Sequence, residues 1–393
     1  KKEGSIDVHY YSIGNDRIAH TELGLLRKAA REGVNVRMVI DGLATYSGKK
    51  SENKYNSKHI KGILKELVKN GVQIKTHNPP YLMPIKLNNR NHNKILKLSQ
   101  SVIIGDRNLR HENYDTNANN ENSLIGFDII VKGDILTQMR IYLDQFWESH
   151  KLRKERFSGI SEHYEKWGRE RLDEIEKENF LNLFSSSPKD INDMYNQLNE
   201  EFVKPDYLEW IFDRDNNSKN IKIKSLSSMD KIISAIYRAR ESIKIISPYM
   251  VLTNRMKYAL KHAMKKNVHV EFASNGTEES MIFLNKIMSA GYIYESKKYC
   301  DLGIEMKEIQ NNSKKKIHAK VVIIDGRTVF ISSNNWNHHS QSFNVEVGVR
   351  IDDEIIAQNV LDWYERLPLT PISQGPCLLN IEVILFKLLK FIL

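Results

Sequence analysis

The residues with the clearest capacity for chemistry lie in the segment KKIHAKVVIIDGRTVFISSNNW, residues 315–336. His318 and Lys320 alternate with aliphatic residues, so on a strand both side chains project from one face. The Asp-Gly pair that follows predicts a turn, and the return strand would bring Ser333 and Asn335 back to the same end. An imidazole, an ammonium, a hydroxyl and an amide would then converge, and such a set suits a phosphoryl group.

A second, imperfect copy of this pattern reads NHNKILKLSQSVIIGDRN, residues 91–108. His92 and Lys94 again share a strand face, and the return strand ends at Asn108. Attack on phosphorus needs a neutral imidazole, whereas protonation of a leaving oxygen needs a charged one. Two histidines on opposite sides of one phosphorus would divide this work, so we expect His92 and His318 to act together and predict neither a metal nor another cofactor.

The two motifs end two stretches in which strands and helices alternate in a similar order. In the first stretch, apolar residues at strand and helix spacing predict strands over 6–13, 34–41 and 72–78, with helices over 17–32 and 56–71. In the second, the same criteria predict helices over 229–243, 254–267 and 278–291 and strands over 244–249, 268–274 and 292–296. This duplication of a large unit predicts parallel or mixed sheets covered by helices.

We therefore predict an α/β fold of two pseudo-symmetric halves, each a mixed β-sheet flanked by helices, with the active site at their interface. The halves would span residues 1–155 and 226–366. Closely spaced opposite charges predict a helical connector over 156–225. Residues 367–393 would form a tail whose first, proline-containing part is expected to be irregular. An amphipathic helix would follow it and would either dock on the protein or lie in a membrane surface.

Composition narrows the class of partner. The 393 residues include 40% hydrophobic and 27% charged residues, which is typical of a globular protein. The net charge of +10 favours anionic partners, either nucleic acid or anionic lipid, but charge alone does not separate the two. The chain starts almost directly on a predicted strand, so we expect an upstream segment to be missing.

The repeated pattern of His-x-Lys, four residues, Asp and a downstream Asn resembles the phospholipase D superfamily. The second copy fits this pattern fully, with its Asp at Asp325. Longer segments, among them GDRNLRHENYD and NNWNHHSQSFNVEVGVRID, are similar to bacterial cardiolipin synthases of the YmdC-like branch. The resemblance implies two phospholipase D-like halves and covers roughly residues 5–390 by motif matching.

The resemblance also implies a role for each motif residue. His92 would be the nucleophile that forms a phosphohistidine, and His318 would be the general acid and then the base. Asp325 would be structural, and Glu346 and Asp128 would each orient the histidine across the site. Lys94, Asn108, Lys320 and Asn335 would bind the phosphate. Ser333, which the hairpin would bring to the same end, is expected to bind it as well.

The first copy departs from the pattern at two positions. Ser99 stands where the motif has Asp, and the hairpin is one residue shorter than the second. Asp106 stands where a small residue is expected before Arg107. These changes bear on the placement of His92, because a small misplacement of a catalytic group costs much of the rate.

We predict an enzyme, most simply a phosphatidyltransferase or phosphodiesterase of cardiolipin synthase type that acts on phospholipids. Water in place of the acceptor alcohol would make it a phospholipase D-type hydrolase, and this choice depends on water exclusion. The alternatives from other classes are a phospholipase D-family nuclease and a catalytically impaired membrane-binding homologue. The expected partners are a phospholipid substrate and an anionic membrane, ahead of nucleic acid, and the expected location is peripheral on the bacterial inner (cytoplasmic) membrane.

Overall fold

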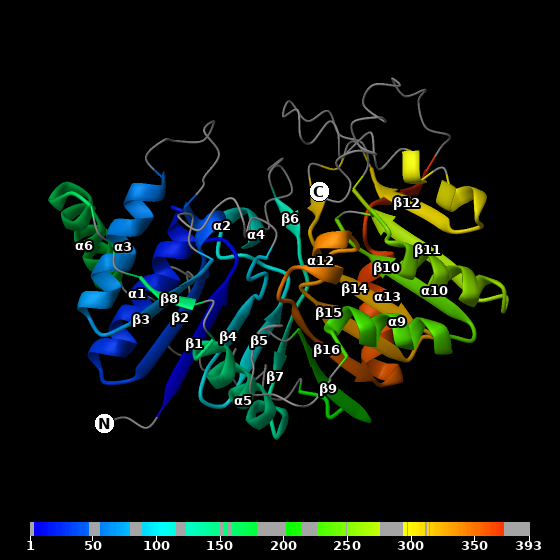
Figure 1. Cartoon of the computed structure of the whole chain (residues 1–393), viewed down its shortest axis with the longest axis horizontal. Helices are drawn as coiled ribbons and strands as arrows, with labels where there is room; N and C mark the ends of the chain where they lie inside the picture. The colour runs from blue at the N-terminus through cyan, green and yellow to red at the C-terminus, as the bar shows by residue number, and fades with distance from the viewer. Residues whose placement is uncertain are drawn as a thin grey trace.

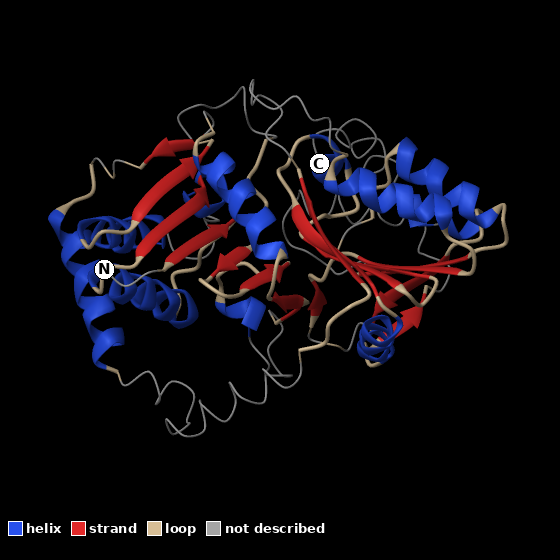
Figure 2. Ribbon diagram, turned by 90° about the horizontal axis from the view of Figure 1, so that it is seen from below, coloured by secondary structure: helices blue, strands red, loops and turns tan. Residues whose placement is uncertain are grey.

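Two β-sheets form the framework of the molecule, one from each half of the chain (Figure 1). The computed structural model describes residues 4–46, 56–78, 89–114, 123–149, 152–155, 157, 159–178, 202–213, 226–248, 250–275, 294–296, 298–310, 313 and 315–372. Helices flank the sheets, as Figure 2 shows. The predicted α/β fold of two similar halves is confirmed.

The first sheet has seven strands in the order β7-β5-β4-β1-β2-β3-β8. The strands are β1 (Ser5–Tyr10), β2 (Asn35–Asp41), β3 (Gln73–His77), β4 (Ile95–Lys97), β5 (Val102–Gly105), β7 (Asp128–Val131) and β8 (Leu152–Lys154). β1, β2 and β3 are parallel and are linked by α1 (Arg17–Arg31) and α3 (Asn56–Lys69), whereas β4, β5 and β7 continue the sheet in antiparallel fashion.

Local sequence explains where α1 starts and stops. The Asp16 carboxylate accepts a hydrogen bond from Ala19 N at 3.0 Å and caps the first turn. Leu23 and Leu26 are buried on the face toward the sheet. Gly33, with φ of +90°, ends the helix in a conformation that favours glycine.

The second sheet repeats this plan in eight strands, in the order β17-β12-β11-β10-β14-β15-β16-β9. The strands are β9 (Tyr207–Phe212), β10 (Ser242–Ile246), β11 (His269–Ser274), β12 (Glu305–Ile309), β14 (Val321–Ile324), β15 (Thr328–Ser332), β16 (Val347–Asp352) and β17 (Leu369–Pro371). Three parallel strands, β12, β11 and β10, are followed by the antiparallel β14, β15 and β16, so β14 and β15 correspond to β4 and β5.

Three hydrophobic clusters hold the molecule together, and one is shared between the halves. One lies under α1 and α3, and another under α9 (Ser228–Arg238) and α10 (Asn254–Met264). The shared cluster joins residues of both sheets to α5 (Ile135–Trp147) and α13 (Glu354–Glu365). Separation of the halves would expose this apolar surface to water, so burial favours one fixed arrangement.

Backbone pairing next to each motif also joins the two halves. β13 (Lys316–Ile317) pairs in parallel with β6 (Leu124–Ile125), and Asn91 forms a parallel bridge with Val345. Both histidine segments are therefore fixed to the opposite half, which brings the two motifs together.

The connector predicted over 156–225 is only partly helical within the described residues. α6 (Glu162–Lys177) packs on α1 and α3, and Arg27 donates to its Asp173 and Glu176 at 2.7 Å each. Residues 207–212 instead form β9 at the edge of the second sheet, where Trp210 is buried. The segment YLEWIF is rich in aromatic residues, which favour strands, and it overrides the helical pattern of the charged residues around it.

Two other expectations were wrong. In the segment predicted as a strand over 292–296, residues 294–296 are helical, and the next strand is β12. The tail expected to be irregular contributes β17, whose Pro371 is tolerated because it ends an edge strand. The helix predicted over 278–291 and the amphipathic C-terminal helix lie outside the described residues. None of the helices that are described has the length and apolarity to cross a bilayer.

Candidate active site

The second hairpin, β14 and β15, is closed by the Asp-Gly turn. Asp325 and Gly326 have φ of +53° and +59°, and Arg327 N donates to Ile324 O at 3.1 Å. Positive φ at both central residues is the geometry of a type I′ turn, whose twist matches that of the flanking strands.

The Asp325 carboxylate ties this turn to the start of β10. It accepts hydrogen bonds from the backbone N–H groups of Arg240, Glu241 and Ser242 at 2.8–3.2 Å. In the first half, Ser99 is exposed and lines a cavity of about 690 Å³. The two hairpins therefore have corresponding strands, but their turns differ: the carboxylate of Asp325 fixes the second turn, and the first has Ser99 in its place.

We expect Asp325→Ala to lower the free energy of unfolding by about 2 kcal/mol, because several backbone donors lose a charged acceptor. Urea unfolding of both proteins measures this difference. Ser99→Ala is the matched control and should change stability by less than about 0.5 kcal/mol, as an exposed position should. Equal losses in the two variants would contradict the assigned role of Asp325.

His92 is held across the interface by the second half. Its Nδ1 lies 3.0 Å from the carbonyl oxygen of Ser333 and 2.8 Å from Glu346 Oε2. A carbonyl oxygen only accepts hydrogen bonds, so Nδ1 carries the proton. The neutral ring then has its lone pair on Nε2, which leaves Nε2 as the atom for attack on phosphorus.

His318 is held by a carboxylate of the first half, but not by the predicted one. Its Nδ1 lies 3.0 Å from Asp106 Oδ1. Asp128 instead accepts from the backbone N–H groups of Asp106 and Arg107 and forms an ion pair with the Arg107 side chain at 2.9 Å. The prediction that Asp128 orients His318 was therefore wrong, because Asp128 is held by the segment that carries Asp106.

Both motif lysines are buried and bind the backbone of their own histidine. Lys94 Nζ donates to His92 O at 2.7 Å, and Lys320 Nζ donates to His318 O. Burial lowers the pKa of Lys94 well below its ordinary value, although the carboxylate of Glu346 acts against this shift. Burial likewise lowers the pKa of Lys320 to about 8. The two ammonium groups together offer positive charge to an anionic phosphate.

The histidines differ in how strongly the site keeps them neutral. Burial, with the charges of Lys94 and Lys320, lowers the pKa of His92 well below its ordinary value. Burial and the charge of Lys320 lower the pKa of His318 to about 4, while Asp106 opposes the shift. The side chain of His318 is 19% exposed and that of His92 9%. Both rings are therefore mainly neutral at pH 7, which suits His92 to attack, and the charge of Asp106 favours the protonated form of His318 against the effect of burial.

The remaining residues predicted to bind phosphate differ in the hydrogen bonds that they already make. The Oδ1 atoms of Asn108 and Asn335 have no hydrogen-bond partner among the described residues. An amide oxygen only accepts, so contact with phosphate oxygens would fall to the Nδ2 groups of these two asparagines. Ser333 donates its only hydroxyl proton to Glu346, and its oxygen accepts from Val347 N at 3.0 Å. Ser333 therefore contacts Glu346, and its contact with phosphate stays a prediction.

Sequence reasoning missed two residues that support the first motif. The Tyr11 ring packs edge-on against His92, with 4.9 Å between ring centroids, and Lys94 Nζ lies 5.3 Å from the centre of that ring. Asp41, which is fully buried, accepts from Arg90 and from Asn91 N just before the motif. The strand-end positions of Tyr11 and Asp41 were the available signal, since functional side chains gather where strands end.

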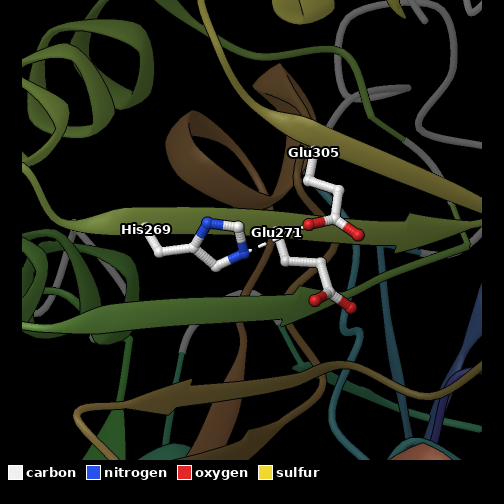
Figure 3. Close-up of side chains that lie close together, drawn as sticks. All are labelled: His269, Glu271 and Glu305. Atoms are coloured by element: carbon white, nitrogen blue, oxygen red, sulfur yellow. Dashed lines mark ion pairs between the residues drawn. The ribbon is translucent and has the colours of Figure 1, made fainter.

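Within the part of the chain that the structure describes, one group outside the motifs has metal-ligating residue types: His269, Glu271 and Glu305, whose ligand atoms lie within 4.8 Å of one another. Figure 3 shows the imidazole of His269 directed at Glu305. His269 Nε2 lies 3.2 Å from Glu305 Oε2. Glu271 already forms ion pairs with Lys244 at 2.9 Å and Lys307 at 3.0 Å. A divalent cation would have to displace two ammonium groups, so we interpret the group as an ion-pair network.

Comparisons with known proteins agree with this geometry. A family model described as "Cardiolipin synthase, PLD-like domain" matches residues 2–147 and 232–368. Cardiolipin synthase C of Escherichia coli (strain K12) is 24% identical over 91% of this chain and 78% of its own length. A cardiolipin synthase of Geobacillus kaustophilus is 22% identical over 88% of the chain, which spans 58% of that relative. The solved phosphatidylserine synthase of Haemophilus influenzae matches 99% of this chain and 90% of its own, at 12% identity and a TM-score of 0.68.

Proposed function

The chain belongs to the cardiolipin synthase, PLD-like family, and from this premise we propose that it is a phosphatidyltransferase that acts through a phosphohistidine. The observation that carries the proposal is the pair of histidines from opposite halves, each held at Nδ1 by a carboxylate of the other half. Relatives named cardiolipin synthase support a phospholipid as the substrate.

In the first step, His92 Nε2 attacks the phosphorus of a phospholipid such as phosphatidylglycerol. The P–N bond forms as the P–O bond to the head-group alcohol breaks, and His318 in its imidazolium form gives a proton to the leaving oxygen. Lys94 and Lys320 supply the positive charge that stabilises the non-bridging oxygens, with Asn108 and Asn335 as further donors.

In the second step, His318 is neutral and accepts the proton of the incoming hydroxyl group. The resulting oxygen attacks phosphorus, the P–N bond breaks and His92 returns to its neutral form. With a second phosphatidylglycerol as the acceptor, the products are cardiolipin and glycerol. With water as the acceptor, the product is phosphatidic acid, so exclusion of water from the intermediate decides the outcome.

The proposed partner is an anionic membrane, with the protein bound peripherally at the bacterial inner membrane. The net charge of +10 supports attraction to anionic head groups. Residues 1–155 and 226–366 remain our proposed limits for the two catalytic halves, with β9 assigned to the second sheet although it precedes the second half.

We expect the protein to convert phosphatidylglycerol vesicles into cardiolipin and glycerol, measured by separation of the lipids and mass spectrometry. Product should be absent with His92→Ala. Phosphatidic acid without cardiolipin would refute the transferase and retain a hydrolase. Cleavage of single-stranded DNA in a chelator, lost with His318→Ala, would favour a nuclease. Vesicle binding without any phosphohistidine would indicate an impaired homologue.

A further inference from the structure

The strand registers show which positions of the two hairpins are equivalent. Ser332 at the end of β15 pairs with Gly348, and Gly105 at the end of β5 pairs with Asp128. Asp128 therefore corresponds to Gly348, not to a carboxylate. Gly126, two residues before Asp128, therefore corresponds to Glu346, two residues before Gly348.

The histidine backbones give the same equivalence independently. His92 N donates to Val345 O at 3.0 Å, and the next residue is Glu346. His318 N donates to Ile125 O at 2.8 Å, and the next residue is Gly126. Where the second half carries the carboxylate that holds the opposite histidine, the first half carries no side chain.

Asp106 makes the contacts that Ser333 and Glu346 make together in the second half. Asp106 corresponds to Ser333, because each follows the last paired residue of its strand. Its Oδ2 accepts from Phe127 N at 2.7 Å, as the Ser333 hydroxyl oxygen accepts from Val347 N. Its Oδ1 holds His318, as Glu346 holds His92.

Side chains at positions 106 and 126 exclude each other sterically. A Cβ atom on Gly126 would lie 2.8 Å from Asp106 Oδ1 and 2.9 Å from Arg107 Cγ. Both separations are below ordinary carbon contact distances, so the Asp106 carboxylate occupies the space that a side chain at 126 would fill.

We propose that Asp106 and Gly126 are a compensating pair: Asp106 is the positioning residue for His318, and Gly126 leaves the space that its carboxylate needs. The proposal rests on the proposed function only for the chemistry that His318 performs. A carboxylate on Nδ1 fixes the proton there, directs Nε2 to the substrate and stabilises the imidazolium that protonates the leaving oxygen. Burial opposes ionisation of Asp106, but the hydrogen bond from His318 and the charge of Lys320 hold its pKa below the usual range.

The test moves the carboxylate from position 106 to position 126, which corresponds to Glu346 in the second half. Asp106→Ser removes it, and Asp106→Ser/Gly126→Glu rebuilds the arrangement of the second half. A triple variant adds Arg107→Asn, because Asn334 occupies that place in the second hairpin and Arg107 Cγ approaches position 126. Asp128→Asn is the matched control, since Asp128 contacts Arg107 and the backbone N–H of Asp106 but not His318, and asparagine keeps an oxygen that can accept from that N–H.

Two measurements distinguish positioning from a structural role. The first is the ¹⁵N chemical shifts of His318 at neutral pH, which report the tautomer without any activity. We expect Nδ1–H in the wild type and the Asp128→Asn control, a mixture in Asp106→Ser, and Nδ1–H again in the double or triple variant. This readout stands even if the protein proves to have no lipid activity.

The second measurement is kcat on a phosphodiester with an alkyl alcohol leaving group, compared with bis(p-nitrophenyl) phosphate, whose leaving group needs no protonation. Asp106→Ser should lower kcat by about 10²-fold on the first and less than about tenfold on the second. The double or triple variant should raise kcat on the alkyl phosphodiester at least about tenfold above that of Asp106→Ser. An unchanged tautomer in Asp106→Ser, or no recovery of tautomer in folded double and triple variants, would overturn the proposal.

Discussion

His92→Ala should abolish cleavage of every phosphodiester substrate, whereas His318→Ala should strongly lower the cleavage rate only where the leaving group needs a proton. His92 has its Nε2 lone pair free because Nδ1 donates to Ser333 O, and without it no P–N bond forms. His318 serves proton transfer, which contributes about 10²–10⁴-fold on an alkyl leaving group. On bis(p-nitrophenyl) phosphate, His318→Ala should keep most of the first-step rate.

The measurement is a stopped-flow release of p-nitrophenolate together with isolation of the labelled intermediate. In His318→Ala, a burst followed by slow turnover is expected, because the base of the second step is missing. His262→Ala, on the exposed side of α10, is the control and should have wild-type rates. A burst in His92→Ala and none in His318→Ala would reverse the assigned roles.

The repeated architecture could be predicted because its causes are local. Apolar residues at helical spacing predicted α1 and α3. Alternation around His318 predicted one continuous strand, but residues 316–317 and 321–324 form β13 and β14, and His318 and Lys320 lie between them. β9 was missed because its six residues lie within a long charged segment and form a strand by pairing with β16. The helical residues 294–296 show the same limit, since a short apolar run fits either structure.

Within the site, motif spacing located both histidines and both lysines, but not all of their partners. Glu346 was identified by its place after the second motif, and it does contact His92. The same reasoning selected Asp128, which is two residues beyond the position equivalent to Glu346. Spacing along the chain does not show strand register, and register decides which carboxylate reaches across. Asp106 was visible as a departure from the pattern, but its contact with His318 required the fold.

Loss of the charge on Lys320 should have the second-largest effect on activity. Lys320→Met is expected to lower kcat/KM at pH 7 by about 10²–10³-fold, because a buried positive charge beside the phosphate is removed. In the wild type, the pKa of Lys320 is lowered by burial to about 8, so the ammonium is present below that pH and is lost above it. Activity on bis(p-nitrophenyl) phosphate should therefore fall above pH 8, with protonation of the leaving group playing no part.

Lys320→Arg separates charge loss from other alkaline effects, because a guanidinium stays protonated throughout this range. Its activity at pH 7 can be lower than that of the wild type, but its pH profile should lack the fall near pH 8. Lys94→Arg is the matched variant in the other half, where burial also lowers the lysine pKa. If the alkaline fall persists unchanged in Lys320→Arg, the charge on Lys320 does not control substrate capture, and phosphate binding would have to rest on Lys94 and the asparagine amides.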